Sequence, residues 1–468
     1  ELLERAAELS PADSTEQKME KLRGVFSRSG SDLTTVVPLA AGLMSIPYKE
    51  APSSGLTRSA MRHRDDLREA LLGHLFGLTA RWPVLNGRTL DLHDAGLRVL
   101  AHPTVASKQF LITIGDRYVG GLTVRDQLVG PWQMPVADCA ITLAGYDGHA
   151  GEAMAIGERT PLALIDPAAA ARMAVGEAIT NLCAAPVASL EQVKLSANWM
   201  AAAGHDGEDA RLFDAVRAVG MELCPSLDLS IPVGKDSLSM QAQWQEAVIG
   251  DSELVIGAEQ TASIDGSTPS NHQSPMTTHR THKVVSPVSL VISAFAPVTD
   301  VRAQLTPLLS REPDTELWLI GLGAGKQRIG GSVLAQCFGA FGGACPDVDD
   351  GSRLKAFFEL ICDAREAGLL LAYHDRSDGG AFAALCEMAF CSHAGLDIDL
   401  AGWGEDRIDD VFRVLFNEEL GAVVEIAAGD RAEFADLFSN SAYGLSRNAI
   451  GSGVKLSNVA QQFSQGNI

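Results

Sequence analysis

The chain has 468 residues, of which 46% are hydrophobic and 21% charged, values typical of folded globular proteins and not of disordered or collagen-like chains. This length predicts two or three domains. The formal net charge of −22 would repel a phosphate backbone, so we expect no nucleic-acid partner. The longest apolar run is too short to cross a bilayer, so we expect no membrane partner either.

The cysteines and the start of the chain bear on its location. The eight cysteines lie in apolar stretches without CxxC spacing, as buried free thiols of a reducing compartment do, so we expect a cytoplasmic protein. The sequence opens at Glu1 without a start methionine or a charged-then-apolar leader. We therefore expect a piece of a longer protein that is not secreted.

The first part of the chain, residues 1–98, has a linker-like texture, with an amphipathic helix predicted at 58–76. After it, short stretches rich in Ile, Leu and Val alternate with helical patterns, which is typical of an α/β fold. These predicted strands are at 110–114, 119–125, 162–165 and 193–197.

Two helices have clear start or stop signals. Asp166 is suited to cap a helix and Pro167 to occupy its first turn, which predicts a helix running to Leu182. A second helix is predicted at 209–223, where Pro225 follows and should stop it.

A polar stretch divides the chain. Residues 263–283 have the composition of an exposed insertion, and a buried strand is predicted after it at 287–296. A new α/β unit begins near Glu316. We therefore predict three parts, at 1–98, 99–299 and 300–468.

Common nucleotide signatures are incomplete in this sequence. The glycine-rich stretch 321–327 lacks the upstream glycine and the Ser or Thr of a P-loop, and it does not complete GxGxxG. There is no GxSxG elbow and no cysteine in a recognisable nucleophile context, so a hydrolase is not favoured and no catalytic residue is assigned. A nucleotide would have to be bound in another way.

Hard oxygen ligands occur at three separated places: Asp138, the pair Glu177 and Asn181, and Asp375 within 374–380. Glu177 and Asn181 are four residues apart, so one helical face presents a carboxylate and an amide to the same cation. Mg²⁺ takes such oxygens together with substrate phosphates. The sequence therefore indicates a magnesium-bound polyphosphate.

Ordinary structural roles explain some of the same residues. Glu177 and Asn181 could form a solvated helix face, and 374–380 could be a turn that caps the next helix. Asp138 differs, because a carboxylate within an apolar stretch needs a partner.

Two further groups leave alternatives open. Lys235 and Ser237, in a small-polar turn expected after a strand at 227–233, are a candidate phosphate or substrate contact, and an ordinary turn with a solvated lysine explains them equally well. His272, His279 and His282 could form a metal cluster, although histidines in a polar loop are more often solvated.

Seven stretches in one order resemble the large, single-chain formylglycinamidine ribonucleotide synthetases. They are 102–117, 125–139, 151–159, 194–204, 231–240, 374–380 and 416–421. The likeness covers roughly residues 95–455. It implies an α/β (α+β) fold similar to aminoimidazole ribonucleotide synthetase, with an N-terminal half-barrel domain and a C-terminal α/β domain, and it places this chain as the second of two synthetase repeats.

The resemblance also implies ligands. The family's Mg²⁺ ligands match Asp138, Glu177, Asn181 and Asp375, and its nucleotide contacts match Ala137 and Ser377. In the family reaction ATP phosphorylates the amide of formylglycinamide ribonucleotide, and glutamine-derived ammonia displaces the phosphate to give the amidine of purine biosynthesis. The ATP or ADP site of this repeat resembles the auxiliary one, where the nucleotide is structural.

Several departures limit what the chain does by itself. Residues 1–98 do not match the family, the insertion at 263–283 is longer than usual, and the glutaminase domain is absent. We expect the chain alone not to complete the reaction, for which the first repeat and a glutaminase are the missing partners. Two alternatives stay open: another ATP-dependent synthetase of the superfamily, which should lack 130–133 and 194–200, and a non-catalytic scaffold that a nucleotide stabilises.

Overall fold

The structure is a computed structural model. It describes residues 13–14, 17–18, 20–21, 23, 84–85, 88–115, 121–134, 137–249, 277–312, 314–396, 398, 408–439 and 451–456. The helix predicted at 58–76 lies outside these residues. Among the described helices, none combines the length and the apolarity that crossing a bilayer requires. All eight cysteines are free thiols, five of them buried, as the sequence indicated.

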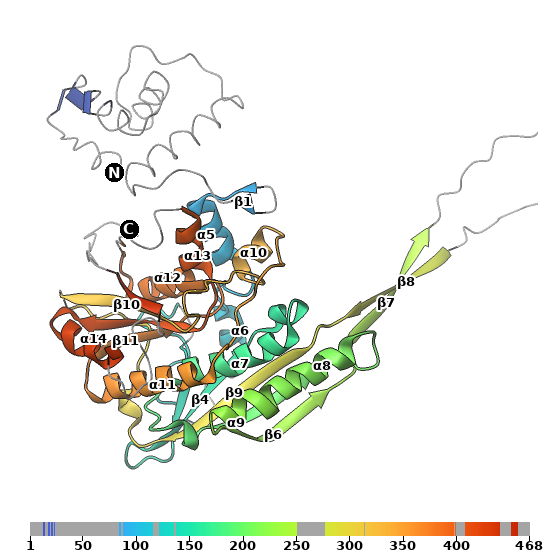
Figure 1. Cartoon of the computed structure of the whole chain (residues 1–468), viewed down its shortest axis with the longest axis horizontal. Coiled ribbons are helices and arrows are strands. Elements are labelled where there is room, and N and C mark those ends of the chain that lie inside the picture. Colours follow the sequence, from blue (N-terminus) through green and yellow to red (C-terminus); the bar gives the residue numbers. More distant parts are fainter. Residues whose placement is uncertain are drawn as a thin grey trace, which may run out of the picture.

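A five-stranded sheet forms the lower half of the molecule in Figure 1. Its order is β3-β4-β9-β5-β6, antiparallel except for the parallel pair β5 and β6. Alternating burial along β9 shows that one face of this sheet is covered and the other is more open. The strands are β3 (Ala140–Leu143), β4 (Gly151–Glu158), β5 (Lys194–Met200), β6 (Ser230–Ser237) and β9 (Ser289–Val298).

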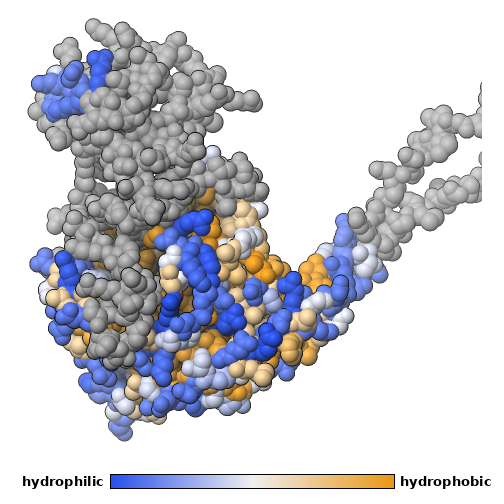
Figure 2. Space-filling model, viewed as in Figure 1, coloured by the Kyte–Doolittle hydropathy of each residue, from blue (hydrophilic) through white to orange (hydrophobic). Residues whose placement is uncertain are grey.

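Two long strands form a separate two-stranded ribbon beside this sheet. β7 (Gln241–Ile249) and β8 (Thr277–Val285) pair antiparallel over their whole length and project away from the body (Figure 1). On the ribbon, Trp244 stacks on His282 with ring centroids 5.2 Å apart. The described surface at the base of the ribbon carries both hydrophilic and hydrophobic residues (Figure 2).

The second half is built on a four-stranded antiparallel sheet of order β11-β12-β10-β13. Its strands are β10 (Thr315–Gly321), β11 (Leu370–Asp375), β12 (Gly421–Ala427) and β13 (Gly451–Leu456). Its helices are α10 (Val333–Cys337), α11 (Gly351–Glu366), α12 (Gly380–Ser392), α13 (Ile408–Phe416) and α14 (Arg431–Ser439). The short turns η4 (Val301–Ala303) and η5 (Ala428–Asp430) are 3₁₀-helical.

Helix α7 (Pro167–Leu182) lies between the two halves and contacts strands of both, β4 and β9 on one side and β11 on the other. Its alanines and glycine allow this close approach, because a side chain at Gly176 would meet Leu420 within 2.2 Å. One continuous core surrounds the helix and includes Ile292 of the first sheet and Val424 of the second. The position of α7 is therefore fixed relative to both sheets.

The other helical segments of the first half run beside α7. They are η1 (Thr160–Leu164), η2 (Leu190–Gln192), α8 (Glu208–Arg217), a π-helical stretch η3 (Ala218–Leu223) and α9 (Cys224–Ser226). Before the first sheet come the short pair β1 (Val84–Leu85) and β2 (Arg88–Thr89), followed by α5 (Leu92–Ala101) and α6 (Gln109–Ile114).

Several predicted elements are confirmed. The helix capped by Asp166 begins and ends as expected, with the Asp166 carboxylate accepting a hydrogen bond from Ala169 N. The strands predicted at 193–197 and 287–296 are β5 and β9. The helix predicted at 209–223 is α8 and its π-helical extension, although Pro225 does not end it, since it occupies the first turn of α9.

Other predicted elements are wrong. Residues 110–114, expected as a strand, form α6, and the described part of 119–125 contains only an isolated bridge at Thr123. Residues 162–164 belong to the 3₁₀ helix η1, in which Pro161 is the second residue, because proline is tolerated in the first turn of a helix. The turn expected at 234–237 and part of the insertion at 263–283 are strands, β6 and β8. Residues 92–98, expected to be linker-like, form most of α5, which packs on α10 and α12.

Candidate functional site

Three elements bring acidic side chains together where the two halves meet. Asp138 lies two residues before β3, Asp375 is the last residue of β11, and Glu177 lies on α7. After Asp375 the chain turns sharply into α12 through Gly379 and Gly380, both with positive φ. A Cβ at Gly380 would lie 2.6 Å from Leu415 O, so this close turn requires glycine.

The first group, here called the aspartate group, consists of Asp138, His374, Asp375 and Glu387. The ligand atoms of the first three lie within 4.8 Å of one another. His374 joins two carboxylates, with Nδ1 2.7 Å from Asp138 Oδ1 and Nε2 2.7 Å from Glu387 Oε2. Asp375 N donates to the same Asp138 oxygen at 3.2 Å.

Two oxygens of the aspartate group have no hydrogen-bond partner among the residues that the structure describes. Asp138 Oδ2 and Asp375 Oδ2 are both buried and unpaired. Burial, together with the neighbouring Asp138 carboxylate, holds the pKa of Asp375 well above its usual range. For His374, burial opposes ionisation, but the carboxylates of Asp138 and Glu387 outweigh it and raise the pKa well above the ordinary value. Each unpaired oxygen costs free energy unless a cation or a proton occupies it.

The second group, here called the arginine group, consists of Arg159, Glu177, Asp378 and Glu418. Arg159 is buried, and its guanidinium donates to Asp378 Oδ1 and Glu418 Oε2, each at 2.9 Å. Its Nη1 also lies 3.8 Å from Glu177 Oε1. Although burial opposes the charge, the surrounding carboxylates raise the pKa of Arg159 further, so it is permanently cationic.

Backbone N–H groups complete the arginine group. Glu177 Oε2 accepts from Glu158 N at 2.7 Å, and Glu418 Oε1 accepts from Val333 N and Gly379 N. Burial, together with the neighbouring Asp378 carboxylate, nevertheless outweighs Arg159 and raises the pKa of Glu177 to about 8 and that of Glu418 to about 7. Each of its four side chains takes part in a hydrogen bond or ion pair within the group, in which three carboxyl groups share one guanidinium.

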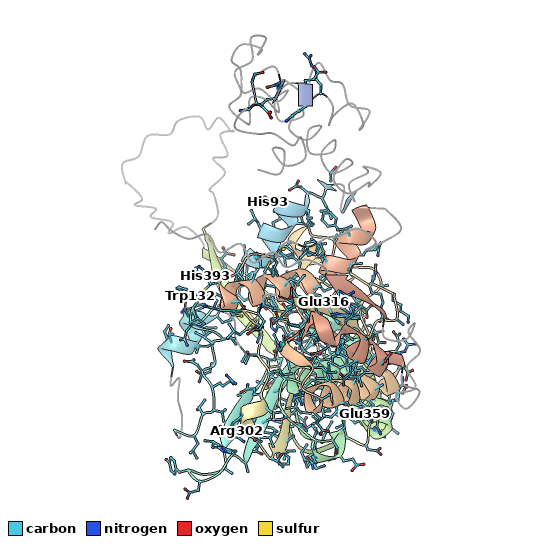
Figure 3. The ribbon with its side chains drawn as sticks, turned by 90° about the vertical axis from the view of Figure 1, so that its left-hand side faces the viewer. His93, Trp132, Arg302, Glu316, Glu359 and His393 are labelled. Carbon is cyan, nitrogen blue, oxygen red and sulfur yellow. The ribbon has the colours of Figure 1, made fainter. Side chains whose placement is uncertain are left out.

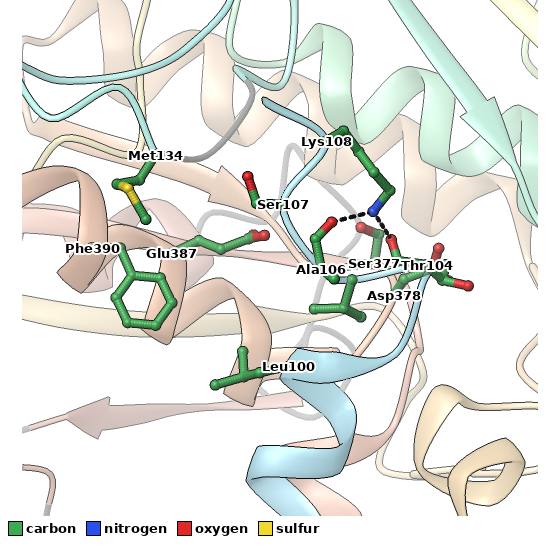
Figure 4. Close-up of a pocket in the computed structure, with 11 residues that line it drawn as sticks. Leu100, Thr104, Ala106, Ser107, Lys108, Met134, Ser377, Asp378, Glu387 and Phe390 are labelled. Carbon is green, nitrogen blue, oxygen red and sulfur yellow. Dashed lines mark hydrogen bonds between the residues drawn. The ribbon is translucent and has the colours of Figure 1, made fainter. Parts of the chain in front are cut away.

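A pocket of about 390 Å³ adjoins both groups. Glu387 of the aspartate group and Asp378 of the arginine group line it together with Ser377 (Figure 4). Part of its wall is apolar and part is polar. The remaining lining residues are Leu100, Thr104, Val105, Ala106, Ser107, Lys108, Met134 and Phe390.

Lys108 is the cationic residue of this pocket. Its ammonium donates to the carbonyl oxygens of Thr104 and Ala106 at 2.8 and 2.5 Å, as Figure 4 shows. Burial lowers its pKa, and the nearby Glu387 and Asp378 act in the opposite direction. A lysine held by two carbonyls beside a cavity offers a positive charge to an anionic ligand.

The structure brings some of the predicted residues together and separates others. Asp138 and Asp375 are in contact through the backbone of Asp375, and Glu177 lies near enough for its charge to raise the pKa of Asp375. Asn181 Nδ2 donates to Ile156 O at 3.0 Å, which leaves its Oδ1 for a cation. Ser377 lines the pocket.

Three other predicted residues contribute less directly. Ala137, next to Asp138, donates its N–H to Gln127 O at 2.9 Å. Lys235 and Ser237 lie on β6 in the exposed part of the first sheet, where Lys235 Nζ is 2.8 Å from Ser237 Oγ. They are not among the residues that line the described pocket. In the histidine-rich insertion, the side chain of His282 bonds to Glu246 Oε2 at 2.9 Å.

The sequence did not single out several residues that the structure places here. His374 is adjacent to Asp375, and Arg159 is the last residue of 151–159, which carried the family resemblance. Both residues could therefore have been identified from the sequence nearby. Lys108 and Asp378 also lie within such stretches. Glu387 had none, because it sits on the largely apolar helix α12 and only tertiary packing brings it to His374.

An exposed aromatic contact lies near the pocket. Trp132 and His393 have ring centroids 4.3 Å apart and lie side by side in Figure 3. Trp132 is separated by one residue from Met134, and His393 by two from Phe390, both of which line the pocket. The surface next to the pocket is therefore partly apolar.

Comparisons with known protein families fit this arrangement of two halves. Residues 107–262 match the model of the FGAR-AT PurM N-like domain, and residues 314–452 match that of the AIR synthase related protein, C-terminal domain. The chain has an AIR-synthase-like fold. The predicted fold class is thereby confirmed, with a PurM-like N-terminal domain and an AIR-synthase-like C-terminal domain.

Solved structures similar to this chain include Thermotoga maritima PurL complexed with ATP, at 13% identity and a TM-score of 0.46, over 75% of this chain and 47% of that one. PurL of the same organism complexed with FGAR has 12% identity and a TM-score of 0.49, over 75% and 48%. Thiamine-monophosphate kinase from Stenotrophomonas maltophilia has 14% identity and a TM-score of 0.38, over 64% and 84%. The chain thus spans about half the length of the PurL structures it matches.

Proposed function

We propose that this chain is part of an ATP-dependent formylglycinamidine ribonucleotide synthetase of purine biosynthesis, and that its pocket and aspartate group bind a magnesium nucleotide. The observation that carries the proposal is the pair of buried, unpaired oxygens, Asp138 Oδ2 and Asp375 Oδ2, beside a pocket that a nucleotide could enter. The match of the N-terminal domain to the FGAR-AT model supports this reaction.

The charge balance of the site supports a cation. Across the two groups and Lys108, acidic side chains outnumber basic ones. The acids are Asp138, Glu177, Asp375, Asp378, Glu387 and Glu418, and the bases are Lys108, Arg159 and His374. A bound Mg²⁺ would neutralise part of this excess, and its preferred ligands are the oxygens that the site offers.

The residues that would hold the cation are Asp138, Glu177, Asn181 and Asp375. Asp138 and Asp375 contribute the unpaired oxygens, while Glu177 and Asn181 present a carboxylate and an amide oxygen from successive turns of α7. When bound, Mg²⁺ would screen the charge of a polyphosphate against these acids. Lys108 and Ser377 would meet the nucleotide in the pocket, with Ala137 beside the cation.

The nucleotide in this site is proposed to be auxiliary and structural. A nucleotide that stiffens the junction of the two halves would lock α7 between its two sheets. In this proposal the domains divide at 99–299 and 300–468, and the reacting ATP binds in a first repeat outside this chain. Glutamine-derived ammonia comes from a glutaminase, in a cytoplasmic enzyme, and Lys235 and Ser237 remain a candidate contact for the substrate.

The test is a titration of the full 468-residue chain with ADP, with and without Mg²⁺, by calorimetry and by thermal shift, because a ligand that binds only the folded state raises its melting temperature. We expect ADP binding that strengthens at least about tenfold with Mg²⁺, a difference of about 1.4 kcal/mol. No binding under either condition would contradict the proposal.

A turnover assay separates an auxiliary site from a reacting one. The chain is supplied with formylglycinamide ribonucleotide, ATP, Mg²⁺ and a high ammonium concentration, and ADP and amidine are measured. We expect binding without turnover. Turnover close to that of a complete synthetase would contradict the auxiliary role.

A further inference from the structure

The side chain of Glu387 belongs to two places at once. It lines the nucleotide pocket, where it is 30% exposed, and its Oε2 lies 2.7 Å from His374 Nε2. His374 Nδ1 in turn lies 2.7 Å from Asp138 Oδ1. Three side chains from three elements, α12, β11 and the segment before β3, thus form one continuous line from the pocket to the aspartate group.

The end of this line determines how Asp138 is oriented. Asp138 Oδ1 receives His374 Nδ1 and, at a longer 3.2 Å, the N–H of Asp375. With Oδ1 held in this way, Oδ2 is left buried and unpaired, as is Asp375 Oδ2. If the ring of His374 turned, Asp138 would keep only the longer contact, and its carboxylate could rotate away from Asp375.

The other end of the line holds the ring. Among the described residues, Glu387 is the hydrogen-bond partner of His374 Nε2, and Asp138 is the partner of Nδ1. A partner on the far side of an imidazole fixes its orientation, and changing such outer partners typically costs about 10- to 100-fold in metal affinity. We propose that Glu387 is a positioning residue, which through His374 aims Asp138 at a divalent cation without touching the cation itself.

This inference rests on the proposed function, since it assumes that a cation binds between Asp138 and Asp375. It adds that the pocket and the cation site are linked through Glu387. A ligand in the pocket meets the same carboxylate that holds His374, so cation and nucleotide binding should depend on one residue that belongs to neither ligand set.

Positioning and simple charge make opposite predictions for two conservative substitutions. Glu387→Gln keeps the length and an acceptor oxygen but loses the charge. Glu387→Asp keeps the charge, but its reach is one carbon–carbon bond, about 1.5 Å, shorter. If Glu387 acts by holding His374, Glu387→Gln should retain function and Glu387→Asp should not.

The measurement is Mn²⁺ binding to the full chain without nucleotide, followed by the electron paramagnetic resonance of free and bound Mn²⁺. We expect Mn²⁺ affinity to fall at least about tenfold in Glu387→Ala and Glu387→Asp, and to stay within about threefold of the parent in Glu387→Gln. Glu366→Ala, which removes an exposed carboxylate of α11, is the matched control and should bind Mn²⁺ like the parent. Melting temperatures confirm that each variant is folded.

The possible failures are distinguishable. Affinity kept in Glu387→Asp and lost in Glu387→Gln would show that charge alone matters, and would overturn the positioning role. Parent-like affinity in all three variants would overturn it as well. If the parent chain itself binds neither Mn²⁺ nor ADP, the proposed function fails and takes this inference with it.

Discussion

The aspartate group and the arginine group are neighbours with similar residues, but they differ in how far their polar atoms are hydrogen-bonded. In the arginine group, Arg159 and backbone N–H groups hydrogen-bond to Glu177, Asp378 and Glu418. In the aspartate group, Asp138 and Asp375 each retain a buried oxygen without a partner. The comparison indicates that Arg159, Asp378 and Glu418 satisfy one another within the fold, whereas Asp138 and Asp375 need a cation or a proton.

The largest expected effect comes from removing the cation of the arginine group. Arg159→Met leaves Glu177, Asp378 and Glu418 buried around an uncharged side chain, and breaking a buried ion pair in this way costs about 3–5 kcal/mol. Chemical denaturation should show this loss in the free energy of unfolding. The control is Arg302→Ala, because the exposed Arg302 forms an ion pair with the exposed Asp300 and, among the described residues, with no other acid, so no measurable change is expected.

A substitution in the aspartate group should affect ligand binding more than stability. Asp138→Asn keeps the shape and an acceptor for His374 Nδ1 but removes a charge that faces Asp375. Without a cation, the lost repulsion between Asp138 and Asp375 and the lost attraction between Asp138 and His374 oppose each other, so stability should change by less than in Arg159→Met. With Mg²⁺, nucleotide affinity should fall by at least about 100-fold, because Asp138 is proposed as a direct ligand and changing even the outer partners of a ligand costs about 10- to 100-fold. A loss of stability without any loss of Mg²⁺-dependent ADP binding would contradict this difference, because Asp138 would then stabilise the fold as Arg159 does.

A third prediction concerns pH. Burial raises the pKa of Glu418 to about 7, above the value of an unfolded glutamate, so the folded chain holds this proton more tightly. The stability that this proton contributes is fully present below about pH 4.5 and is lost as the pH rises to about 7. Glu418→Gln cannot titrate, so its free energy of unfolding should fall less over this range. Parallel pH profiles of parent and variant would contradict the assignment.

The smallest effect is expected at the first sheet. Lys235 lies on β6 with its ammonium on Ser237 Oγ, and it does not line the described pocket. Lys235→Ala should therefore leave the Mg²⁺-dependent affinity for ADP within about twofold, a change of less than about 0.5 kcal/mol. A tenfold loss measured by the same calorimetry would extend the nucleotide site to β6.

The sequence predicted those features whose causes are local. Asp166 and Pro167 marked the start of α7 because capping needs only adjacent residues, and this placed Glu177 and Asn181 on one face. The strand predicted at 110–114 was wrong, since a short run of apolar residues is equally compatible with a strand and with one or two turns of helix. Glu387 could not be predicted, because its role depends on α12 packing beside β11.

The most direct test of this contrast is a crystal structure of the chain with ADP and Mn²⁺, in which anomalous scattering locates the metal. The account predicts a peak bound by Asp138 Oδ2 and Asp375 Oδ2, at a ligand distance of about 2.0–2.2 Å, with ADP in the pocket beside Lys108. ADP in the pocket with no metal between these two carboxylates, or a metal held by Asp378 and Glu418 and not by Asp138 and Asp375, would contradict the proposed cation site.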